Sequence, residues 1–150
     1  SRNVVGKMRD LVWSIDSRSD TLQDLVDKMN KKMAILLGPK GIGYKLDIKD
    51  LPLDKTIPVI TRQQLFLIFN EAITNVVRHS NACEMTVAMY NTKSSFEMII
   101  KDNGNASSQS TIKSTGFGLR NIQMRAAKIK ATIEVERIDG FEVRLTMPRL

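Results

Sequence analysis

The spacing of the apolar residues alternates between a helical and a strand period, and this alternation constrains the fold more than any other sequence feature. Residues 21–37 carry apolar side chains at helical spacing behind Ser19 and Asp20, either of which is a suitable helix cap. Residues 42–49 then alternate apolar and polar side chains, which predicts a half-buried strand. The same criteria predict helices over 61–79 and 119–130, and strands over 83–90, 95–101, 133–138 and 141–147.

Helices placed at intervals along hairpin-forming strands are typical of an α/β fold. We expect a two-layer α/β sandwich, with a mixed, mainly antiparallel sheet and helices on one face. A further amphipathic helix is predicted over residues 2–15, before a polar break at 17–20. The longest apolar run, Met33–Leu37, is far shorter than the roughly 20 residues of a membrane helix. The lone Cys83 excludes an internal disulfide and a cysteine-based zinc site, and it favours a reducing compartment.

The net charge of +7 favours an anionic ligand, but the basic residues are scattered among acidic ones along the whole chain. Aromatic residues make up 5% of the sequence, so a surface on which bases could stack is not expected. Direct nucleic-acid binding is therefore disfavoured. A nucleotide such as ATP is also an anion and is compatible with the same charge.

The helix predicted over 61–79 has two unlike faces. Glu71, Asn75, Arg78 and His79 fall on one side at 100° per residue, opposite an apolar stripe. Such a polar stripe is common on solvated surface helices. A carboxylate, a carboxamide, a guanidinium and an imidazole are also the groups that hold Mg²⁺, position a nucleophile and neutralise phosphate oxygens.

Two glycine clusters flank a polar stretch over residues 105–115 that we expect to be a mobile loop. The first cluster, Asp102-Asn103-Gly104, presents a carboxylate at a strand end, and a carboxylate accepts a hydrogen bond from the amino group of adenine. The second, Gly116-Phe117-Gly118, precedes a helix whose N-terminal amides attract an anion. Each cluster alone is a weak signal, but together they indicate a nucleotide site covered by a loop.

Four segments in order resemble the sequence boxes of one ATPase superfamily. FNEAITNVVRHSNA (69–82) is similar to the N box of histidine-kinase ATP-binding domains, and DNG (102–104) and GFGLRNIQMRAA (116–127) to its two glycine boxes. FEVRLTMP (141–148) is similar to the closing strand. The chain thus resembles the GHKL superfamily of histidine kinases, type II topoisomerases, a heat-shock chaperone and mismatch-repair ATPases. It is most similar to compact kinases paired with helix-turn-helix response regulators.

The resemblance implies a Bergerat-type ATPase fold that binds ATP and Mg²⁺. It implies that Asn75 is the Mg²⁺ ligand and that Glu71 is the catalytic base. The other implied nucleotide-binding residues are Arg78 and His79 at the phosphates, Asp102 and Gly104 at adenine, and Gly116, Gly118 and Leu119 at the second glycine box. Ala106 departs from the family pattern, because a second glycine usually stands there.

The resemblance also implies a division of the chain. Residues 1–18 correspond to the C-terminal end of a dimerisation helix, and residues 19–150 to the ATPase domain of a sensor histidine kinase. The sole histidine, His79, lies in the N box, so the phosphoacceptor histidine is expected on a dimerisation domain outside this sequence. The implied partners are that domain and a response regulator, within a homodimeric parent. The resemblance implies a cytoplasmic kinase core and is compatible with a parent protein anchored in the inner membrane.

Two other functions are compatible with the same residues. A GHKL ATPase of the topoisomerase or chaperone type would use Glu71 and Asn75 for hydrolysis instead of transfer to histidine. A non-catalytic nucleotide-binding module is the second alternative, favoured by Ala106 in the first glycine box. Transfer of phosphate to a supplied dimerisation domain distinguishes the kinase from both.

Overall fold

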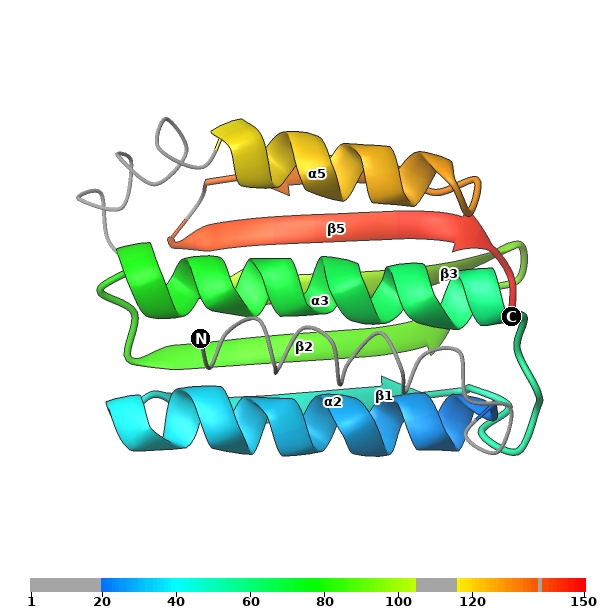
Figure 1. The fold of residues 1–150 in the computed structure, drawn as a ribbon, viewed down its shortest axis with the longest axis horizontal. Coiled ribbons are helices and arrows are strands. Elements are labelled where there is room, and N and C mark those ends of the chain that lie inside the picture. Colours follow the sequence, from blue (N-terminus) through cyan, green and yellow to red (C-terminus); the bar gives the residue numbers. More distant parts are fainter. Residues whose placement is uncertain (1–19, 105–115, 138) are drawn as a thin grey trace, which may run out of the picture.

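The computed structural model describes residues 20–104, 116–137 and 139–150, which form one five-stranded sheet with helices on one face (Figure 1). The strand order is β1-β2-β3-β5-β4, with β1 and β2 parallel and the other pairs antiparallel. This confirms the predicted α/β sandwich with its mainly antiparallel sheet. In chain order the elements are α2 (Leu22–Leu37), the 3₁₀ turn η2 (Gly38–Lys40), β1 (Gly43–Lys49), α3 (Val59–His79), β2 (Glu84–Asn91), β3 (Ser95–Asp102), α5 (Gly116–Ala127), β4 (Thr132–Glu136) and β5 (Phe141–Pro148).

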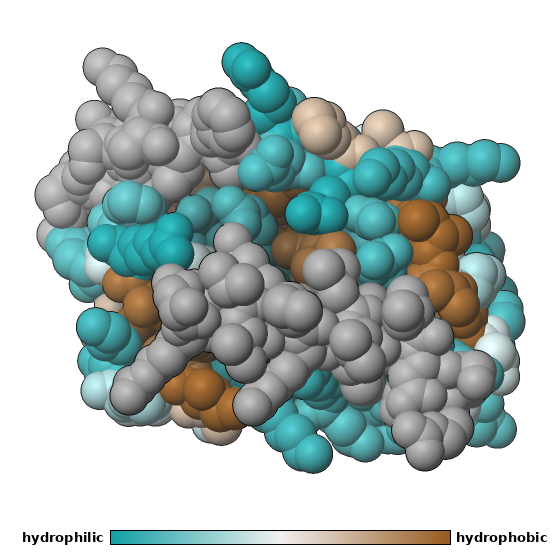
Figure 2. All heavy atoms as spheres, viewed as in Figure 1, coloured by the Kyte–Doolittle hydropathy of each residue, from teal (hydrophilic) through white to brown (hydrophobic). Residues whose placement is uncertain are grey.

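The core lies between the sheet and the three helices. Alternate strand residues point toward the helices, so that Val87 lies between Leu46 and Ile100 in one cross-strand row. The opposite face of the sheet is polar, and there Arg144 of β5 pairs with Glu97 of β3 at 2.8 Å. Seen from the helical side, the described surface is mainly hydrophilic, with apolar atoms visible in separate places (Figure 2).

The helix boundaries differ from the predicted ones for local reasons. Thr21, not Ser19 or Asp20, is the N-cap of α2, and its side chain and that of Asp24 form a reciprocal capping box. Helix α3 begins at Val59, two residues earlier than predicted. The prediction missed Val59 and Ile60 because their side chains are exposed and do not follow the apolar period of the buried face. Helix α5 ends at Ala127 because Lys130 adopts a left-handed backbone with φ 56°, and Ala131 N donates to Ala126 O at 2.9 Å.

The loop between β1 and α3 supports the beginning of α2. Leu22 N and Gln23 N, which have no partner within the helix, donate to the carbonyls of Lys55 and Leu53 at 2.9 and 2.8 Å. The predicted helix over 2–15 and the predicted mobile loop over 105–115 lie outside the described residues. Within 20–104, 116–137 and 139–150, no helix is both long and apolar enough to cross a membrane.

Candidate functional site

The polar side chains of α3 share one face of the helix, as predicted. Glu71 and Asn75 are half-buried, and Arg78 and His79 are exposed in the last turn. Two turns before Glu71 on the same face, Gln64 contacts α5, since Arg125 donates to Gln64 Oε1 at 3.5 Å. The C-terminal end of α3 and the beginning of α5 lie at the same end of the molecule (Figure 1). The fold therefore brings the polar side chains in the last turn of α3 to the same end as the N-terminus of α5.

Asp102 is the last residue of β3 and lies at this same end of the sheet. It occupies a cross-strand row with Tyr44, Met85 and Phe141, on the side of the sheet that the helices cover. The exposed fraction of Asp102 is 5%, and its neighbours in the row are apolar or aromatic. A carboxylate that is buried at a strand end is typical of a binding group.

The Asp102 carboxylate is surrounded by hydrogen-bond donors from three parts of the chain. Gly104 N donates to Oδ1 at 2.7 Å, and the Phe141 backbone and the Ser80 side chain also donate to the carboxyl group. Burial raises the pKa of Asp102 above its ordinary value, and these three hydrogen bonds and the positive charge of Arg137 oppose that rise. The group is thus desolvated and yet held as a hydrogen-bond acceptor.

Gly104 is buried and leaves no room for a side chain. A Cβ there would lie 2.5 Å from Ser80 Oγ, 2.9 Å from Asp102 Oδ1 and 3.3 Å from Asn81 Oδ1. The sequence predicts that Gly104 lets a ligand ring approach the backbone closely. The structure adds a second reason, which is that the turn after β3 packs directly on the end of α3.

Asn103 fastens the same turn to β2. Its Oδ1 accepts from Cys83 N at 2.9 Å and from Glu84 N at 3.0 Å, while Asn103 N donates to Glu84 O at 3.2 Å. The Asn103 side chain also donates to Cys83 Sγ at 3.2 Å. The position of Asp102 is therefore fixed on both sides, by α3 through Ser80 and by β2 through Asn103.

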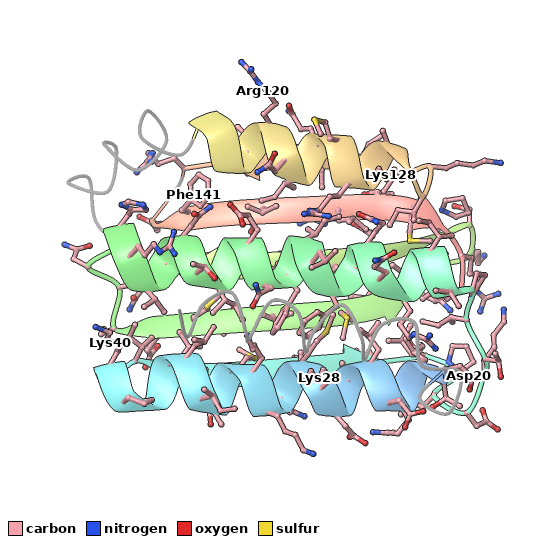
Figure 3. The ribbon with its side chains drawn as sticks, viewed as in Figure 1. Asp20, Lys28, Lys40, Arg120, Lys128 and Phe141 are labelled. Carbon is pink, nitrogen blue, oxygen red and sulfur yellow. The ribbon has the colours of Figure 1, made fainter. Side chains whose placement is uncertain are left out.

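The connection between β4 and β5 forms another wall of the site that sequence reasoning missed. Gly140, predicted as an ordinary hairpin glycine, is buried with φ 126°, and a Cβ there would overlap the carbonyl oxygen of Asp102. Phe141 begins β5 at this end of the sheet (Figure 3), and the Arg137 guanidinium lies 5.5 Å from the centre of its ring. The turn dipeptide gave no signal for this contact, because its partner lies far away in the sequence.

The second glycine box supplies a helix N-terminus. Gly116 and Gly118 lie in the first turn of α5, and Leu119 is half-buried in the same turn. The amides of a helix N-terminus attract phosphate. Arg120, next in α5, points away from the body of the molecule (Figure 3). The described residues contain no cluster of three or more histidine, cysteine, aspartate or glutamate side chains that could hold a metal ion.

The sequence matches a known family over most of this fold. A family model for histidine kinase-, DNA gyrase B- and HSP90-like ATPases matches residues 60–150. The chain is 30% identical over 119 residues to the sensor histidine kinase LiaS of Bacillus subtilis, covering 79% of this chain and 30% of that protein. It is 31% identical over 138 residues to the sensor protein VraS of Staphylococcus haemolyticus, covering 92% and 36%. The chain thus spans about a third of the length of these relatives.

Solved structures of histidine kinases share the fold. The blue-light activated histidine kinase of Erythrobacter litoralis EL346 superposes with a TM-score of 0.70 at 15% identity, over 86% of this chain and 42% of that one. The histidine kinase AdeS of Acinetobacter baumannii superposes with a TM-score of 0.67 at 18% identity, over 99% and 78%.

Proposed function

Because the chain belongs to the family of histidine kinase-, DNA gyrase B- and HSP90-like ATPases, we propose that it is the ATP-binding catalytic domain of a sensor histidine kinase. In this proposal it binds ATP with Mg²⁺ and transfers the γ-phosphoryl group to a histidine on a dimerisation domain. The observation that carries the proposal is the buried, donor-surrounded carboxylate of Asp102, beside a glycine that has no space for a side chain. The sensor kinases among its relatives favour transfer to histidine over a hydrolysis-driven cycle.

The residues fit the proposed ligand in three respects. An ionised carboxylate has about four lone-pair positions, and three donors from the protein leave one for the adenine amino group. The N-terminus of α5, with Gly116 and Gly118, faces the same end of the molecule and suits the phosphates. The positive charges of Arg78 and, when protonated, His79 lie at that end too.

The residues also fit Mg²⁺ without a preformed protein cage. Mg²⁺ is usually held by one or two protein oxygens together with phosphates and water. Asn75 offers a carboxamide oxygen on the half-buried face of α3, and we assign it as the ligand. When bound, the ion would neutralise charge on the phosphates. Glu71, one turn earlier on the same face, is assigned as the base that orients the acceptor imidazole and accepts its proton.

The proposal extends to partners and place. The dimerisation domain of the same protein presents the acceptor histidine, a response regulator receives the phosphoryl group, and the parent acts as a homodimer. We place the domain in the cytoplasm, where ATP is available, and we propose no direct contact with nucleic acid. Residues 1–18 are assigned to the end of the dimerisation helix, and 19–150 to the catalytic domain.

The test is phosphotransfer in trans. The chain is mixed with γ-labelled ATP, Mg²⁺ and the dimerisation domain of its parent, and acid-labile, alkali-stable label on that domain is measured. Label is expected with the acceptor histidine present and not after its replacement by alanine. Release of inorganic phosphate without transfer would identify a hydrolysing ATPase, and tight ATP binding with neither reaction would identify a non-catalytic module. Either result overturns the kinase proposal.

A further inference from the structure

Ser80 links the end of α3 to the carboxylate of Asp102. It is the C-cap residue of α3, and its backbone N donates to Val76 O at 3.0 Å. Its Oγ accepts from Ala82 N at 3.0 Å, so the hydroxyl proton remains available, and it is donated to Asp102. Ser80 Oγ and Asp102 Oδ1 both lie within 3 Å of the point that a Cβ on Gly104 would occupy, at 2.5 and 2.9 Å.

Ser80 is the one side chain among the three described donors to Asp102. The other two, Gly104 N and Phe141 N, are backbone groups that a side-chain substitution leaves in place. All three present protons, so the lone pair that remains on Asp102 accepts from a ligand donor. The exocyclic amino group of adenine is such a donor, whereas guanine presents a carbonyl acceptor at the corresponding position.

We propose that Ser80 is a positioning residue that holds Asp102 as an ionised acceptor and thereby makes the site select adenine over guanine. This inference rests on the proposed function and adds to it a residue that sets base specificity. If Asp102 becomes protonated, its O–H can donate to the guanine carbonyl, and the discrimination between the two bases falls. The hydroxyl of Ser80 opposes that protonation because its hydrogen bond favours the charged form.

Among the described residues, one charged group acts on the pKa of Asp102. Arg137, on the β4–β5 connection, favours the ionised form. From α3, His79 precedes Ser80 and its side chain is exposed. The neighbours of Asp102 on β2 and β5, Met85 and Phe141, carry no charge. Groups that act on the triphosphate affect ATP and GTP alike, so the ratio of the two affinities isolates the contribution of the base.

The experiment compares ATP and GTP binding by calorimetry, with Mg²⁺, from mildly acidic to neutral pH. The variants are Ser80→Ala, which removes the donor, Ser80→Thr, which keeps it, and Ser80→Cys, which leaves a weak donor in its place. Ser94→Ala, in the exposed turn between β2 and β3, is the matched control. Ser80→Ala is expected to lose about tenfold in ATP affinity and to lose little in GTP affinity. Its ATP preference should also fall at a higher pH than that of the unsubstituted domain.

The Thr variant is expected to retain the preference, the Cys variant to be intermediate, and the Ser94 variant to be unchanged. A role in structure alone would weaken both nucleotides equally and would not move the pH at which the preference falls. The carboxyl ¹³C resonance of Asp102, followed by NMR without nucleotide, gives a second readout. Its titration is expected to move to higher pH in Ser80→Ala, because the opposing hydrogen bond is lost.

The outcomes separate this inference from the proposed function. If the unsubstituted domain binds no ATP, the proposed function is wrong, while the NMR titration still reports whether Ser80 holds Asp102 ionised. If it binds ATP selectively and Ser80→Ala keeps the same preference at every pH, the specificity role of Ser80 is wrong and the proposed function stands. An equal loss of ATP and GTP affinity, or an unmoved Asp102 titration, also overturns the inference. Should Ser80→Ala fail to fold, the graded response of the Thr and Cys variants decides the same question.

Discussion

Asp102 combines burial with hydrogen bonds that favour its charged form, and the balance leaves its pKa raised above the ordinary 3.8. A carboxyl group whose pKa is raised in the folded state binds its proton more tightly there than in the unfolded chain. Its contribution to the free energy of unfolding therefore falls as the pH rises through that window. The folded domain thus buries a carboxyl group whose charged form is disfavoured by desolvation, at a cost in stability, which is typical of a residue retained for binding.

Asp102→Asn removes this titration and makes the pH dependence testable. The free energy of unfolding of the variant, minus that of the unsubstituted domain, is expected to increase as the pH rises from 3.8 through the folded-state pKa, and to level off above it. Urea unfolding of both proteins at a series of pH values measures the difference. A difference that stays constant or declines over this window would show that the Asp102 pKa is not raised.

Gly140→Ala tests the contact behind Asp102. The added Cβ would overlap Asp102 O, and φ 126° is strained for any residue but glycine, so we expect a loss of at least about 2 kcal/mol in the free energy of unfolding. Gly43→Ala is the matched control, because a Cβ there meets its nearest atoms at 3.7 Å, an ordinary contact. The control should change stability by less than about 0.5 kcal/mol. Equal stability of the two variants would contradict the proposed packing.

At the scale of elements, the two faces of α3 have different roles. The apolar face packs in the core, and the polar face carries the proposed site residues. Phe69 and Ile73 are fully buried against the sheet, and they stabilise the domain whatever the polar face does. The polar face carries Glu71 and Asn75 toward the end of the molecule where α5 begins. Substitutions on that face are therefore expected to change ligand binding and to leave the fold intact.

Asn75→Ala should abolish the Mg²⁺ dependence of nucleotide binding and change the free energy of unfolding by less than about 1 kcal/mol, since alanine is a good helix former. Calorimetry with and without Mg²⁺ measures the first effect, and urea unfolding the second. Asn30→Ala, on the exposed face of α2, is the control and should bind as the unsubstituted domain does. Full Mg²⁺-ATP affinity in the Asn75 variant, or a large loss of stability, would show that Asn75 is structural.

At the scale of the whole molecule, the chain holds one histidine, and it lies at the proposed nucleotide site. The proposed phosphotransfer therefore requires two domains, and in that proposal the acceptor imidazole is brought to the polar face of α3. Incubated alone with labelled ATP, the chain is expected to gain no acid-labile phosphate. Stable label on His79 would contradict the assignment of the acceptor to another domain.

Glu71→Gln tests the assembled reaction. ATP affinity should be unchanged, because Glu71 is assigned to the acceptor and not to the nucleotide. Transfer to the supplied dimerisation domain should slow by about 10²–10⁴-fold, the effect of losing a general base. Single-turnover measurement of labelled domain checks the rate. Undiminished transfer would remove Glu71 from the mechanism.

The sequence by itself determined the elements and the fold class, because helical and strand periods are local properties that each segment carries alone. It also determined which residues share the polar face of α3, since that follows from the helical repeat. Boundaries departed from expectation where apolar residues such as Val59 remain exposed, or where Lys130 takes a left-handed backbone. The predicted roles of the site residues stay predictions until the variants are measured.

Tertiary structure alone decided how Asp102 is held. Ser80, Asp102 and Gly140 belong to three separate segments, and no local pattern in any of them indicates the other two. They meet because β3 pairs with β5 in a register that places Asp102 opposite Phe141, and because α3 ends over that same row. Register and helix placement depend on how the whole apolar core packs, so the buried, donor-surrounded environment of the carboxylate exists only after the chain has folded.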